Sequence, residues 1–237
     1  MSEKKGNLNP ALVLFFSALA LYLISLFLDS PHLELFCRPV IIPAIFYYYY
    51  TSVKGRINLL FSLTILSYFT AEILFLISDV EFLIPRLLFN LMPYFVITHF
   101  LVQDYFYYLK KKKYKTINLF FYLILIFLVY ILFSVLSLTL ESSQIIFAIY
   151  IAFAVLLLAI SFVCFLILFA FNNKTILYMV LMVISFLISD LFFIFATQMT
   201  DIFALKFIFL ASKQVSFFLY TSYFIKRTKY QLWKVTI

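Results

Sequence analysis

The chain alternates between long apolar runs and short polar segments from one end to the other. Most of the runs approach the roughly 20 residues that an α-helix needs to cross a bilayer. Few residues interrupt them, since the chain has only 2 glycines and 6 prolines. We therefore predict about eight transmembrane helices, at residues 11–28, 38–50, 57–77, 86–109, 117–140, 145–171, 176–197 and 202–225.

Composition supports this interpretation of the pattern. Hydrophobic residues make up 66% of the chain, charged residues 12%, and the mean hydropathy is +1.12. A soluble globule cannot cover so much apolar surface with polar groups. We predict an all-α, polytopic integral membrane protein in which residues 1–237 form one domain. Cys37 and Cys164 fall at different predicted depths and are expected to be free thiols.

The charges indicate how the helices are oriented. The net charge is +8, and most of the 18 Lys and Arg residues lie in the N-terminal segment, at 51–56, 109–116 and 172–174, and in the C-terminal tail. The other set of connections is mostly acidic. Basic residues placed between apolar runs are topology signals, so no nucleic-acid partner is expected. The positive-inside rule puts both termini in the cytoplasm, and we expect the inner (cytoplasmic) membrane of a bacterium.

Candidate chemistry begins with Asp190, a carboxylate deep inside the run at 176–197. Other runs carry Arg38, Glu72, His99 and Lys213. At 1.5 Å of rise per residue, these groups fall within a band of about 10 Å. Ionisable groups inside a membrane avoid lipid and face a polar interior. We therefore predict one shared polar cavity toward the outer leaflet.

Structural roles are the alternatives for each of these residues. Glu72 and Lys213 are also candidates for a buried ion pair that fixes helix register, and Asp190 for a pair with Arg38.

His99 lies four residues before Gln103 and is within hydrogen-bonding reach of it on one helix face. Asp104 is expected to be neutralised at the interface, near the lysines at 110–113.

The residue types limit the chemistry. The predicted spans contain one histidine, too few nitrogen ligands for a catalytic zinc, and neither a nucleophile elbow nor a phosphate-binding glycine loop is present. No metal or cofactor is predicted. Two carboxylates in an apolar cavity can supply an acid and a stabilising anion, which C–O cleavage through an oxocarbenium ion requires.

Four motifs resemble the YhhN family of eight-helix membrane proteins, whose characterised members are lysoplasmalogenases. The family pattern is Lys-Pro, Gly-Asp, Phe-x-x-x-His and Phe-x-x-Ser-Asp, in that order. Its places are taken here by Arg38-Pro39, Ala71-Glu72, Phe95 to His99 and Phe186 to Asp190, and Gln214 also resembles a family position. Arg, Ala and Glu replace the family's Lys, Gly and first Asp.

The resemblance implies hydrolysis of the vinyl-ether bond of a lysoplasmalogen in the membrane, which gives a fatty aldehyde and a glycerophospho-head group. A related ether or ester lipid is the alternative substrate. Glu72, Asp190 and His99 would be catalytic, either carboxylate being the acid, and Arg38, Lys213 and Gln214 would bind substrate. Proton-coupled transport, or lipid binding without catalysis, is the competing hypothesis.

Overall fold

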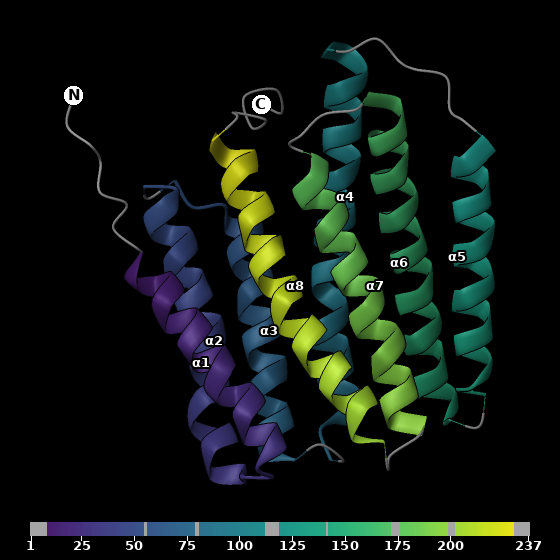
Figure 1. Ribbon diagram of the computed structural model, residues 1–237. Helices are drawn as coiled ribbons and strands as arrows, with labels where there is room; N and C mark the ends of the chain where they lie inside the picture. Colours follow the sequence, from purple (N-terminus) through teal and green to yellow (C-terminus); the bar gives the residue numbers. More distant parts are fainter. Residues whose placement is uncertain are drawn as a thin grey trace, which may run out of the picture.

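The computed structural model describes residues 9–54, 56–78, 81–111, 119–140, 142–171, 176–198 and 202–229, and it is helical throughout apart from short turns (Figure 1). This confirms the predicted all-α class. The helices are α1 (Pro10–Phe27), α2 (Pro31–Ser52), α3 (Leu59–Ile77), α4 (Leu83–Lys111), α5 (Leu119–Ser137), α6 (Gln144–Phe171), α7 (Ile176–Gln198) and α8 (Phe203–Lys229). Consecutive helices run in opposite directions, and α1 begins at the end of the bundle where α8 ends.

The start of the second helix differs from the prediction. The sequence places a polar link before Arg38, but α2 already begins at Pro31. Proline is favoured in the first turn because its φ is pre-set for a helix. Glu34 then pairs with Arg38 one turn later, at 2.7 Å, which supports the helix. Pro39 therefore lies in the helix interior and not in its first turn.

Six helices form a closed ring. Contacts link α2 to α3, α3 to α4, α4 to α6, α6 to α7, α7 to α8, and α8 back to α2. The other two helices lie outside this ring, α1 against α2 and α8, and α5 against α6 and α7. In Figure 1, α5 and α1 accordingly stand at opposite edges of the bundle. The ring places side chains that are far apart in the sequence around one interior.

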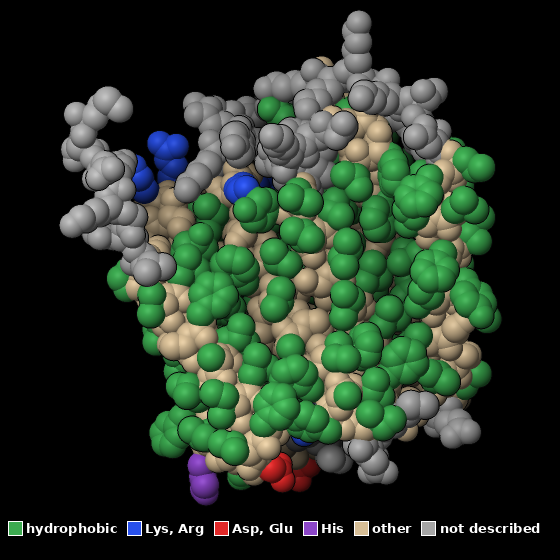
Figure 2. All heavy atoms as spheres, in the orientation of Figure 1, with side chains coloured by type: hydrophobic (Ala, Val, Ile, Leu, Met, Phe, Trp, Pro, Cys, Tyr) green, Lys and Arg blue, Asp and Glu red, His purple; other side chains and the backbone are tan. Residues whose placement is uncertain are grey.

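The outer surface is apolar across the middle of the bundle. Figure 2 shows green side chains over most of this face, Lys and Arg mainly at the end where α8 finishes, and Asp and Glu at the opposite end. Seven of the described helices, all but α2, are long and apolar enough to cross a membrane. An apolar belt of this extent indicates an integral membrane protein. The predicted charge alternation also uses residues that lie outside the described ones, at 1–8, 79, 112–118, 141, 172–175, 201 and 230–237.

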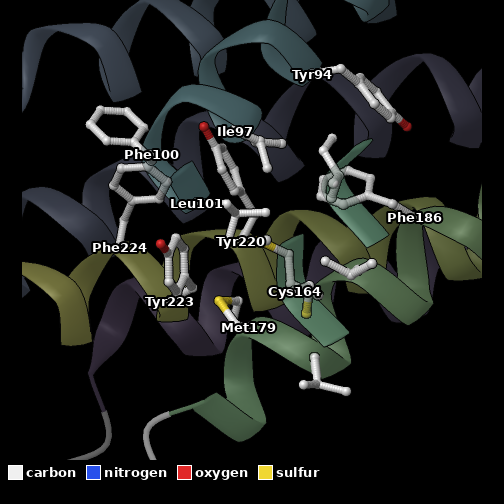
Figure 3. Packing of buried hydrophobic residues seen from close by; sticks show 14 of the residues in the cluster. Tyr94, Ile97, Phe100, Leu101, Cys164, Met179, Phe186, Tyr220, Tyr223 and Phe224 are labelled. Atoms are coloured by element: carbon white, nitrogen blue, oxygen red, sulfur yellow. The ribbon is translucent and has the colours of Figure 1, made fainter. Parts of the chain in front are cut away.

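We call the end of the bundle where α8 finishes the basic end and the opposite end the acidic end. A hydrophobic core fills the ring toward the basic end. Tyr220 and Phe224 of α8 pack against Phe61 of α3 and Phe100 of α4. Figure 3 shows this cluster, in which Tyr94 and Phe186 lie at one edge. Both cysteines are buried and free, as predicted. The cavity described below lies in the other half of the ring, toward the acidic end.

Candidate functional site

A cavity of about 70 Å³ lies inside the ring, and all six ring helices line it. Aromatic side chains form much of its wall, which suits an apolar or amphipathic ligand. Its charged or polar lining residues are Arg38, Tyr68, Arg86, Asn90, Tyr94, Tyr150, Ser189, Asp190, Lys213 and Ser216. We call this space the polar cavity. The sequence-predicted residues Arg38, Asp190 and Lys213 all line it.

Glu72 lies beside this cavity in a cage of cations. Arg38 Nε donates to Glu72 Oε2 at 2.5 Å, and Lys213 Nζ lies 2.6 Å from Glu72 Oε1. The Arg38 and Glu72 side chains are 1% and 2% exposed. Arg38 is further held by Glu34 and by the Phe75 ring, whose centroid is 3.8 Å from the guanidinium carbon. Glu72 is therefore the buried counter-ion that joins α2, α3 and α8.

This geometry decides between the structural pairings that the sequence left open. The pair between Glu72 and Lys213 is confirmed. The predicted pair between Asp190 and Arg38 is wrong, because Arg38 forms its ion pairs with Glu72 and Glu34. Arg38 is close to Glu72 because α2 and α3 are direct neighbours in the ring.

Asp190 has a different environment. Its Oδ2 accepts a hydrogen bond from the Tyr94 hydroxyl at 2.5 Å. Asp190 also lines the cavity, together with Lys213. Tyr94 is itself held by Phe153 and Phe186, with ring centroids 5.3 and 5.4 Å away. Asp190 is thus fixed in position by a phenol at the wall of the cavity.

Two further polar groups point to a ligand in the polar cavity. The Tyr68 hydroxyl and Asn90 Oδ1 are buried, and neither has a hydrogen-bond partner among the described residues. Tyr68 is only 2% exposed, and both residues line the cavity. Buried polar groups normally have a partner. Since one water needs roughly 10–15 Å³, a cavity of this size holds several waters or a small polar group of a ligand.

The site lies at one depth, as predicted from residue counting. Glu72 and Arg38 are five and seven residues from the ends of α3 and α2, and Asp190 and Lys213 are eight and ten residues from the ends of α7 and α8. These ends all belong to the acidic side of the bundle. The four groups therefore lie roughly 8–15 Å inside that side.

His99 does not join them. It is exposed on the outer face of α4, and its Nε2 lies 2.7 Å from Gln103 Nε2, the local bond that the sequence offered as an alternative. Gln214 is buried on α8 and does not line the polar cavity; its Oε1 has no hydrogen-bond partner among the described residues. The structure therefore brings together four of the six predicted site residues, Arg38, Glu72, Asp190 and Lys213.

Asp104 belongs to a second polar cluster, toward the basic end. It is buried, and it accepts hydrogen bonds from Arg227 Nε at 2.8 Å and from the Tyr223 hydroxyl. Arg227 also donates to Gln103 at 3.1 Å. Asp104 is thus neutralised, as expected, and its partner is Arg227 of α8 inside the bundle. This cluster ties α4 to α8.

Sequence reasoning missed Tyr68, Asn90 and Tyr94. Tyr68 lies one turn before Glu72 on α3, and Asn90 and Tyr94 are one turn apart on α4. Positions that are four residues apart share a helix face. Glu72 therefore gave a signal for Tyr68, but Tyr94 is one of 18 tyrosines and had no distinguishing mark.

No known protein family, curated protein or solved structure matches this chain. Among the described residues, no group of three or more His, Cys, Asp or Glu side chains can hold a metal ion. The geometry of the polar cavity is therefore the main guide to function.

Proposed function

We propose that the protein is a membrane-embedded lipid hydrolase, resembling the lysoplasmalogenases of the YhhN family, that cleaves the vinyl-ether bond of a lyso-ether phospholipid. The position of Asp190 carries this proposal: its carboxyl group is oriented by Tyr94, and the residue lines a cavity inside the bundle that combines aromatic and polar side chains. Such a group can act as a general acid toward a substrate bound in the cavity. The membrane lipid is both substrate and partner, and no cofactor is required.

Asp190 is the acid in this proposal, because both Glu72 oxygens already contact cations. Asp190 donates its proton to the β-carbon of the vinyl ether, the alkene carbon that is not bonded to oxygen. The ether oxygen then shares its lone pair with the other carbon to form an oxocarbenium ion. A cavity water then attacks the cationic carbon and returns a proton to Asp190. The resulting hemiacetal breaks its C–O bond to give the aldehyde and the glycerol hydroxyl.

The other residues have supporting roles. Tyr94 orients Asp190. Lys213 and Arg86 line the cavity and are the positive charges proposed for the head-group phosphate. Among the described residues, Lys213 has one carboxylate partner, Glu72, whereas Arg38 has two, Glu34 and Glu72. Glu72 positions Lys213. The hypothesis assigns no contact with the reacting atoms to His99 or Gln214, since neither lines the cavity.

Proton-coupled transport is the alternative function. A transporter needs a path to both sides of the membrane, commonly through broken helices. Here the described helices around the cavity are continuous, and Phe61, Phe100, Tyr220 and Phe224 fill the ring on its basic side. This packing favours a reaction chamber with access from one side.

Mass spectrometry of purified protein with a panel of lyso-lipids tests the function. We expect fatty aldehyde from vinyl-ether substrates, whereas the corresponding alkyl ethers, which cannot form the oxocarbenium ion by protonation at carbon, should give no product. Acid released from ester lyso-lipids would assign a different bond to the same site. The absence of product from every lipid, together with flux that collapses with a proton gradient in liposomes, would establish the transporter instead.

We further propose that all eight helices cross a bacterial inner membrane, with both termini in the cytoplasm. The described chain begins and ends on one side of the bundle, and Lys54, Arg56 and Lys110 belong to that side, whereas Asp29 and Glu81 belong to the other. A C-terminal fusion to a reporter that is active only in the cytoplasm should therefore be active. Activity of a periplasm-specific reporter at that position would contradict this topology.

A further inference from the structure

A second, smaller cavity adjoins the polar cavity. It has a volume of about 30 Å³ and lies between α5, α6 and α7. Four residues line both cavities, namely Tyr150, Phe153, Asp190 and Ile194. The other residues that line the second cavity are all apolar: Leu132, Val135, Leu136, Ala154, Leu157 and Leu191. We call it the chain slot.

The chemistry changes sharply on either side of Asp190. On one side, Tyr68, Asn90 and Lys213 offer polar groups from α3, α4 and α8. On the other side, the chain slot offers no polar side chain beyond those that it shares with the polar cavity. A site with an apolar part and a few convergent polar groups fits an amphipathic molecule. The boundary between its two halves falls at the four shared residues, and Asp190 is the one charged residue among them.

We infer that the chain slot holds the first methylene groups of a single lipid chain, with the head group in the polar cavity. A polar cavity of about 70 Å³ is too small for a whole lipid, so the chain must leave it. The shared lining residues make the chain slot its continuation. This inference rests on the proposed function, and it adds the direction in which the substrate lies.

The orientation has a chemical consequence. With the chain between α5, α6 and α7 and the head group beside Lys213, the bond that joins them lies at Asp190. Binding energy from the unreactive chain then holds the reacting bond against the acid. Ala154 becomes the specificity-determining position, because it is the smallest side chain that lines the chain slot.

Photo-crosslinking of the full-length protein in detergent tests the inference without requiring turnover. The probe is an alkyl-ether lyso-phospholipid, which the proposed reaction does not cleave, with a diazirine near the head-group end of its chain. We expect label at residues 132–136 and 154–157 that is lost when unlabelled alkyl-ether lyso-lipid competes. Ala154→Phe should weaken this binding about tenfold, because it displaces about two buried methylene groups.

Ala148→Phe is the matched control, since Ala148 is exposed on the same helix, and it should leave the label unchanged. Competable label confined to other segments would overturn the chain slot while leaving a lipid-binding function intact. No competable label on the wild-type protein would overturn the proposed function together with the slot. Should Ala154→Phe fail to fold, the position of the wild-type label still decides.

Discussion

Asp190→Asn is expected to abolish lyso-lipid cleavage while the protein stays folded and still binds lipid. The amide keeps the shape of the side chain but can neither donate the proton to carbon nor take one back from water. General acid–base catalysis commonly contributes about 10²–10⁴-fold in rate, so turnover should fall by at least that range. Cleavage and melting temperature would be measured together in detergent.

Asp29→Asn is the matched control for this substitution. Asp29 is exposed between α1 and α2, and its backbone has φ of 47°, a conformation that asparagine also tolerates. The same chemical change there should alter neither rate nor stability. Product formed by Asp190→Asn at the wild-type rate would remove Asp190 from the mechanism, and the assignment of the acid would have to change.

Residue counting along helices predicted the depth of the site. The rise per residue is constant, so the apolar boundaries alone place Arg38, Glu72, Asp190 and Lys213 at one level, and the structure brings these four residues together. Charge alone also suggested that Glu72 and Lys213 are a pair, because an unpaired buried charge is costly.

Which way each side chain points and the order of the helices were not predictable in the same way. His99 lies deeper than the four site residues, roughly 24 Å from the start of α4, and it also faces outward. The direction of a side chain depends on rotation of the helix about its axis, which packing between helices sets. The ring order, in which α4 contacts α6 and α5 stands outside, likewise follows from side-chain fit. Tyr94 belongs to the site for the same reason, because the packing of the helices places α4 where Tyr94 contacts Asp190.

The beginning of α2 shows a limit of hydropathy. His32 and Glu34 made residues 31–37 look like a loop, yet Pro31 starts a helix there, and Glu34 pairs with a buried arginine. A polar segment at a membrane surface can be helical when its charges have partners on the same face.

Glu72→Gln is expected to cause the largest loss of stability among substitutions in the ion-pair cluster of Glu34, Arg38, Glu72 and Lys213. It leaves Arg38 and Lys213 buried without their shared counter-ion, and removal of one partner from a buried pair typically costs about 3–5 kcal/mol. Glu34→Gln is the control on the same arginine. The Glu34 side chain is 25% exposed, so its loss should cost no more than about 1 kcal/mol.

A double substitution separates positioning from chemistry. Lys213→Met removes one of the stranded charges, while Arg38 keeps Glu34, so Glu72→Gln with Lys213→Met should lose less stability than the two single losses added together. Melting temperatures of the four proteins in detergent measure this coupling. Additive losses would show that Glu72 and Lys213 do not depend on each other. A stable Glu72→Gln protein without turnover would instead place Glu72 in the reaction as a second catalytic carboxylate.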